Sequence, residues 1–259
     1  MSTIYRAALV LHIIAGFVGL AAFWTPALVR KGGTLHKRAG RVFYLATCGV
    51  ACTGVVIAAL LLAAPLAIHP PRSPVSSAVE AAITTRIRLT VPFLVYLLLI
   101  TFVPVYHGVR VLATRRAPKE LRTPVHTVLN AAAIAASVAM IGLGIALREP
   151  VFAALSPIGL LVGWGNLQFA RKPSPTPMAW WYEHMGSMIG GGIAFHTAFL
   201  VLGAGRLFGL QLQGANAAIL WVLPTIVGLP ATAIWVRYYR RKFGELQPST
   251  RAATAASRS

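Results

Sequence analysis

The stretch Thr25–Tyr44, TPALVRKGGTLHKRAGRVFY, lies between two long apolar runs and gathers five cations and one histidine. An apolar run crosses a bilayer as a helix when it holds about 20 residues. Lys and Arg concentrate in the short loops on the cytoplasmic side of a membrane. The stretch therefore predicts a cytoplasmic loop that joins two membrane-spanning helices.

The composition of the whole chain agrees with a membrane protein. Of the 259 residues, 57% are hydrophobic and only 11% are charged, and the mean hydropathy is +0.70. Such a chain has too little polar surface for a water-soluble domain. It contains no aspartate and five glutamates, so chemistry that needs paired carboxylates, including glycoside hydrolysis and carboxylate proton relays, is not expected.

The net charge of +19 does not indicate a nucleic-acid-binding protein. The cations stand in short runs beside apolar segments and not along one soluble face, which is the pattern that membrane topology produces. We therefore expect no nucleic-acid partner, and we expect anionic phospholipids at the cytoplasmic face to contact these cations.

Seven apolar runs are long enough to span a bilayer, and they predict an all-α, polytopic membrane helical bundle with about seven transmembrane helices. We predict one transmembrane helical domain over residues 1–243 and a disordered cytoplasmic tail over 244–259, which has no apolar periodicity. The predicted spans are residues 4–29, 43–68, 89–113, 123–146, 150–169, 184–206 and 216–237.

The distribution of Lys and Arg predicts the orientation. With the N-terminus outside, 18 of these residues fall in cytoplasmic segments and six in outer segments. Only Arg6 precedes the first run, whereas a cleaved signal peptide has its cations first. We expect a multi-pass inner-membrane protein with an outer N-terminus and a cytoplasmic C-terminus.

Two histidines are predicted to lie at one depth in the outer half of the bundle. His12 and His196 each fall roughly 12 Å below the outer boundary, judged by how far each lies along its predicted span. Their helices run in opposite directions. Gly16 and Gly192 lie one turn inward on the same helix faces and leave space beside each imidazole. The pair is a candidate for holding a flat ligand, and small-residue helix packing is the equally open alternative.

A second histidine layer is predicted nearer the cytoplasmic face. His107 and His126 fall roughly 9 and 5 Å from the inner boundary, and His36 and His184 lie at that boundary. Interfacial polar packing is the alternative for the boundary histidines.

Two layers of histidines allow several functions. Imidazole is a common axial ligand of haem, so stacked layers could hold haem b and carry electrons across the bilayer to a redox partner. The alternative is a non-redox transporter or a lipid-binding or small-molecule-binding protein in which the same histidines take up protons. A structural role in a complex is also open, and the sequence decides neither enzymatic activity nor oligomeric state. A zinc hydrolase of the seven-span type is disfavoured, because the chain lacks its aspartate and its His-x-x-x-His pair.

The turn at Gly32 and Gly33 can fold the loop back on the bundle, so that His36 and Arg38 point at the inner histidine layer. There Arg38 could pair with a haem propionate, a lipid phosphate or Glu183. With Arg38 included, the candidate cofactor-binding residues are His12, His196, His107, His126, His36, His184 and Arg38.

Short motifs in this chain match a known family. They are His12 in the first span, His36-Lys37-Arg38-Ala39-Gly40-Arg41 in the loop after it, and Trp181 through His184 with Met188 and Thr197-Ala198-Phe199 near the sixth span. In these motifs the chain resembles the bacterial multi-span membrane proteins classed as domain of unknown function 2306. The resemblance covers residues from about 5 to 240 and implies a helical membrane bundle but no particular activity. It marks as matching positions His12, His36, Arg38, Gly40, His184 and Met188.

Overall fold

A computed structural model describes residues 2–71, 73–172, 176–209 and 214–246, and these contain helices and their connections but no strand. Within these ranges, seven helical stretches are long and apolar enough to cross a membrane, and one of them, Pro150–Arg171, joins two shorter helices. The protein is therefore a multi-pass membrane protein, and the predicted all-α bundle with seven spans is confirmed. The predicted disordered tail lies outside the described residues from position 247 onward.

The helices follow one another with short connections. In chain order they are α1 (Ser2–Leu28), α2 (Thr34–Ala63), α3 (Pro65–Ile68), α4 (Ser77–Ala113), the 3₁₀ turn η1 (Pro118–Leu121), α5 (Pro124–Leu147), α6 (Pro150–Leu155), α7 (Pro157–Arg171), α8 (Ala179–Ala198), the π-helical η2 (Phe199–Ala204), α9 (Gly205–Leu207) and α10 (Gly214–Lys242).

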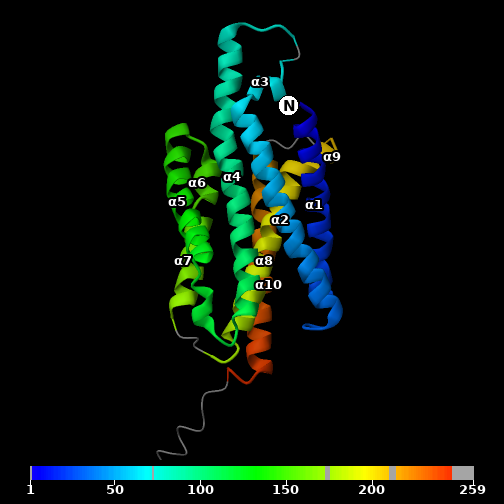
Figure 1. The fold of residues 1–259 in the computed structure, drawn as a ribbon, viewed down its shortest axis with the longest axis vertical. Coiled ribbons are helices and arrows are strands. Elements are labelled where there is room, and N and C mark those ends of the chain that lie inside the picture. Colours follow the sequence, from blue (N-terminus) through cyan, green and yellow to red (C-terminus); the bar gives the residue numbers. More distant parts are fainter. Residues whose placement is uncertain (1, 72, 173–175, 210–213, 247–259) are drawn as a thin grey trace, which may run out of the picture.

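Helix α4 runs through the middle of the bundle (Figure 1). It packs against α2 on one side, which in turn packs against α1, and against α5 and α7 on the other. Helix α8 packs against α4 and also contacts α10. The N-terminus and the C-terminal end of α10 lie at opposite ends of the bundle, as an odd number of spans requires (Figure 1).

One end of the bundle collects most of the cations. The α1–α2 connection, the α4–α5 connection and the C-terminal end of α10 all lie there (Figure 1). We call it the cation-rich end, and its Lys and Arg residues include Arg30, Lys31, Arg115, Arg116, Lys119, Arg240, Arg241 and Lys242.

Two helices are longer than their apolar runs predicted. Helix α4 begins at Ser77 and not near residue 89, because Ser76 accepts a hydrogen bond from the Val79 N–H and Glu80 lies in the first turn. Both features stabilise a helix N-terminus in water. Helix α2 begins at Thr34, so the first turn of this helix contains His36.

The predicted span 150–169 is broken into α6 and α7 at Ser156, where Pro157 begins the second helix. Proline has no N–H to donate, so a backbone carbonyl in the preceding turn loses its helical partner. The buried Tyr96 hydroxyl donates to the carbonyls of Leu155, at 3.1 Å, and Ser156, at 2.7 Å. The Gly159 N–H in turn donates to the Tyr96 hydroxyl at 3.0 Å, so a side chain from α4 pairs backbone groups on both sides of the break.

Glycines allow close helix contacts beside the inner histidines. A Cβ added at Gly108 of α4 would lie 2.9 Å from Cβ of Ser187 on α8. A Cβ added at Gly163 of α7 would lie 2.6 Å from the Asn130 carbonyl oxygen on α5. Small residues four positions apart, such as Gly159 and Gly163, are typical of close helix pairs in membranes.

Candidate functional site

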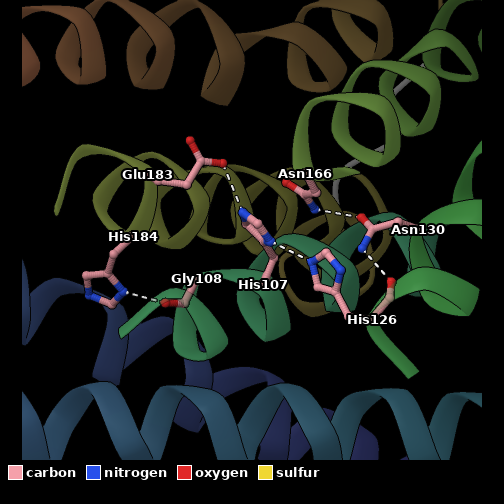
Figure 2. A network of polar contacts seen from close by, with 7 residues as sticks. All are labelled: His107, Gly108, His126, Asn130, Asn166, Glu183 and His184. Carbon is pink, nitrogen blue, oxygen red and sulfur yellow. Dashed lines mark hydrogen bonds and ion pairs between the residues drawn. The ribbon is translucent and has the colours of Figure 1, made fainter. Parts of the chain in front are cut away.

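A chain of hydrogen bonds joins three ionisable side chains from three helices (Figure 2). Nε2 of His107, on α4, lies 2.9 Å from Oε1 of Glu183 on α8. Nδ1 of His107 lies 2.9 Å from Nε2 of His126 on α5. We call Glu183, His107 and His126 the Glu-His-His triad.

The triad lies inside the bundle close to its cation-rich end. The side chains of His107 and His126 are 0% exposed, whereas that of Glu183 is 30% exposed. An ionisable group within a membrane-spanning helix is costly to bury and marks a candidate functional site. The triad thus joins a fully buried imidazole to a carboxylate that reaches the surface of the bundle.

Amide side chains hold the helices around the triad. Nδ2 of Asn130 donates to the His126 carbonyl at 2.7 Å, and Nδ2 of Asn166, on α7, donates to Oδ1 of Asn130 at 2.8 Å. The start of α5 is fixed as well, because Oγ1 of Thr123 accepts from the His126 N–H at 3.2 Å. His126 is therefore positioned by both its own helix and its neighbour.

The hydrogen-bond roles of the two imidazoles are linked. An ionised carboxylate only accepts, so Nε2 of His107 donates to Glu183 when that residue is charged. A neutral His107 then accepts at Nδ1 from the Nε2–H of His126. When His107 carries two protons, the donor and acceptor at the His107–His126 bond exchange roles. Protonation at one end of the triad therefore changes the state of the other end.

One nitrogen of the triad has no partner. Nδ1 of His126 is buried and accepts or donates no hydrogen bond among the described residues. Leaving a buried polar atom unpaired costs about 1–3 kcal/mol. The triad thus ends at Nδ1 of His126, and a group that can donate a proton to this nitrogen would form a favourable hydrogen bond with it.

The start of α8, which carries Glu183, is fixed by the end of α10. Oε1 of Glu245 accepts from the Met178 N–H at 3.0 Å, and Oε2 accepts from the Tyr182 hydroxyl at 2.6 Å. Burial opposes ionisation of Glu245, but these hydrogen bonds outweigh it and lower the pKa of this carboxyl below its ordinary value.

The other two histidines predicted at the inner layer lie apart from the triad. His184 turns away from Glu183, and its Nδ1 donates to the Gly108 carbonyl at 2.9 Å (Figure 2). His36 is half-buried with Nδ1 unpaired among the described residues. Arg38 is exposed, and no ion pair joins it to the inner layer among the described residues.

The two outer histidines bond different helices. Nδ1 of His12 donates to Oγ1 of Thr53 on α2 at 3.0 Å, because that hydroxyl gives its own hydrogen to the Gly49 carbonyl. Nδ1 of His196 donates to the Gly192 carbonyl at 2.7 Å, and its Nε2 accepts from Nε1 of Trp24 at 3.0 Å. Both nitrogens of His196 are therefore occupied, and this side chain links α8 to α1.

His107 and His126, as they are arranged here, leave no room for a haem iron between them. An iron held between two imidazoles, each at roughly 2 Å, separates their nitrogens by roughly 4 Å. The facing nitrogens of His107 and His126 are 2.9 Å apart and share a hydrogen bond. The described residues also contain no cluster of three His, Cys, Asp or Glu side chains that could hold a metal ion. Haem b stays a prediction from the sequence.

Glu183 is the member of the triad that is absent from the candidate residues predicted from the sequence, where it is only a possible partner of Arg38. With the sixth span predicted to begin at residue 184, Glu183 was assigned to a loop, whereas α8 begins at Ala179. The signal was the aromatic run Trp180–Tyr182 directly before it, which marks a membrane interface and not a loop. Asn130 stands one helical turn after His126 in the sequence, whereas nothing in the sequence points to Asn166.

Comparisons of the chain with protein-family models, with curated proteins and with solved structures each found no match. The resemblance to the family classed as domain of unknown function 2306 therefore stays a prediction, and the function has to be argued from the site itself.

Proposed function

We propose that this protein translocates protons across its membrane and that the Glu-His-His triad is part of the proton path. The observation that carries the proposal is the unbroken set of hydrogen bonds from Glu183 through His107 to His126, which ends in an unpaired Nδ1. Histidine takes up and releases protons near neutral pH, and carboxylate and histidine chains are the usual proton paths of membrane pumps and transporters.

The proton balance of one passage is simple. In the starting state Glu183 is ionised and each imidazole carries its proton on Nε2. A proton that reaches Nδ1 of His126 forms an N–H bond there, and His126 passes its Nε2 proton to Nδ1 of His107. His107 then passes its own Nε2 proton to Oε1 of Glu183. Each ring is neutral again, and one proton has moved from the buried end to the partly exposed carboxyl.

The path has to be reset before a second proton can pass in the same direction. After Glu183 releases its proton, both rings carry their hydrogen on Nδ1, and the starting direction of the hydrogen bonds returns only if the rings reorient or exchange their protons with other groups. The rings are fully buried, so either kind of reset requires the packing of α4, α5 and α8 around them to loosen. This requirement favours a transporter that alternates between conformations over an open proton channel.

Further buried polar groups extend along α5 beyond the triad. Asn130 and Ser137 are both 0% exposed, and Ser137 lies 3.4 Å from the hydroxyl of Tyr96. The distance along α5 from His126 to Ser137 is roughly 16 Å, which is about half of a hydrocarbon core of about 30 Å. These groups support a path that continues toward the opposite end of the bundle.

The experiment that tests the proposal is proton flux in vesicles that contain the purified full-length protein. A potassium gradient with valinomycin sets the membrane potential, and an enclosed pH-sensitive dye reports proton entry. We expect flux well above that of protein-free vesicles and at least a tenfold loss in Glu183→Gln and in His126→Gln. The matched control is Glu120→Gln, because Glu120 is exposed at the same end of the bundle.

Flux in the wild type no greater than in protein-free vesicles, or equal losses in Glu183→Gln and Glu120→Gln, contradicts the proposal. An absorption spectrum of the same preparation, oxidised and then reduced, tests the haem prediction. A reducible b-type spectrum that disappears in the histidine variants favours transmembrane electron transfer instead.

A further inference from the structure

A cavity of about 440 Å³ opens at the cation-rich end, between the ends of α1, α8 and α10. The triad is not among its lining residues, so the inference below does not rest on proton translocation. The lining combines three cations with three aromatic rings, namely Arg30, Lys31, Lys242, Trp181, Tyr239 and Phe243.

The cations of this cavity lack acidic partners. Among the described residues the one ion pair is His107–Glu183, so no carboxylate lies within bridging distance of Arg30, Lys31 or Lys242. Glu245, the acidic residue nearest in sequence to Lys242, accepts instead from Met178 and Tyr182. The positive charge of the cavity is therefore not neutralised by described side chains.

Lys31 is held in place at this cavity. Its Nζ donates to the carbonyls of Pro26 and Ala27, the latter at 2.9 Å, and lies 5.1 Å from the ring centroid of Trp235. Burial lowers the pKa of Lys31, and an anion beside it would oppose that shift. By bonding the last carbonyls of α1, Lys31 also offsets the negative end of the helix dipole, which would otherwise repel an anion.

The aromatic side of the cavity is suited to the boundary between lipid headgroups and acyl chains. The ring centroids of Trp181 and Tyr239 are 4.1 Å apart, and those of Trp181 and Phe243 are 5.6 Å apart. Trp and Tyr prefer the membrane interface because one end of each ring is apolar and the other is polar. Ala27 lines the cavity. Leu28, the next residue in the chain, is not part of the lining but is 82% exposed, so it offers an apolar surface to an acyl chain.

We propose that this cavity binds the phosphate group of an anionic phospholipid, with Arg30 and Lys242 as its principal contacts and Trp181, Tyr239 and Phe243 against the glycerol region. Arginine and lysine are the usual phosphate-binding residues of proteins, and basic pockets between membrane helices bind anionic headgroups. A lipid fits better than a free anion, because the cavity lies where helices that cross the membrane end.

The test uses the purified, delipidated full-length protein with phosphatidylglycerol, phosphatidylcholine or inorganic phosphate at constant ionic strength. We expect phosphatidylglycerol alone to raise the Tm, and native mass spectrometry to show one lipid that survives delipidation more strongly than the rest. The double variant Arg30→Gln/Lys242→Gln should bind phosphatidylglycerol at least tenfold more weakly. Trp181→Leu should weaken binding without a change in charge.

The matched control is Arg116→Gln/Lys119→Gln, which removes two exposed cations at the same end of the bundle. An equal loss of affinity in this control overturns the proposal, because it shows general attraction to surface charge. A Tm increase of the same size with inorganic phosphate overturns the assignment to a lipid. Undiminished binding of phosphatidylglycerol by the Arg30/Lys242 variant overturns the site.

Discussion

Imidazoles within the helices of this protein differ in how completely their nitrogens are paired, and that difference separates structural histidines from the candidate proton carriers. His196 has partners at both nitrogens, and its tautomer is fixed by the Gly192 carbonyl. His107 also has two partners, but both of them are ionisable. His126 has one free nitrogen. A proton can therefore be passed between His107 and His126. Protonation of His196 at Nε2 would instead remove the acceptor of the Trp24 hydrogen bond and so break a link between α8 and α1.

The link formed by His196 predicts a cost in stability. In His196→Leu the Nε1–H of Trp24 loses its acceptor, and we expect a loss of about 1 kcal/mol in the free energy of unfolding, in the range measured for hydrogen bonds between membrane helices. Unfolding in mixed micelles measures this difference. The control is His69→Leu, since His69 is exposed and its contact with Tyr5 is long, at 3.5 Å. Equal stability of His196→Leu and the wild type contradicts the structural role.

At the scale of helices, the contact between α5 and α7 depends on glycine. In Gly163→Ala the new Cβ meets the Asn130 carbonyl at 2.6 Å and Cγ1 of Ile134 at 2.8 Å. Such overpacking costs about 1–3 kcal/mol. Gly165→Ala, in the same helix, meets nothing within 4 Å and should be neutral or slightly stabilising. Thermal unfolding of the two variants compares them directly, and an equal Tm in both means that α5 and α7 are not in close contact.

The contact between α8 and α10 predicts a pH dependence. The pKa of Glu245 is lowered in the folded protein, so its contribution to stability is complete above the ordinary carboxyl pKa and is lost as the pH falls through the lowered value. We expect the wild type to exceed Glu245→Gln in Tm at neutral pH and the difference to shrink on acidification. Glu120→Gln, which removes an exposed carboxylate, should show no such trend. A difference in Tm that grows toward low pH has the wrong sign for this contact.

For the whole molecule, hydropathy was sufficient to predict seven spans, because each run is apolar over about the thickness of a bilayer. It did not predict where helices begin in water, as at Ser77, since capping and not apolarity decides such a start. Depth along the spans put His107 and His126 in one layer, and in the structure these two side chains bond each other. Depth also put His12 and His196 at one level, yet these bond Thr53 and Trp24. Equal depth does not identify neighbours, because rotation about each helix axis decides which side chains face each other.

The orientation of the bundle is the remaining prediction at this scale. The excess of Lys and Arg at the cation-rich end predicts that this end is cytoplasmic, so the connection between α3 and α4 is outside. In a background with Cys48→Ala and Cys52→Ala, Ser73→Cys and Arg116→Cys each place one thiol at an exposed position in an opposite connection. In spheroplasts, a maleimide that cannot cross membranes should label Ser73→Cys at once and Arg116→Cys only after permeabilisation. The reverse pattern would place the partly exposed Glu183 toward the outer face, and proton entry from the cytoplasm would then begin at the buried end of the triad.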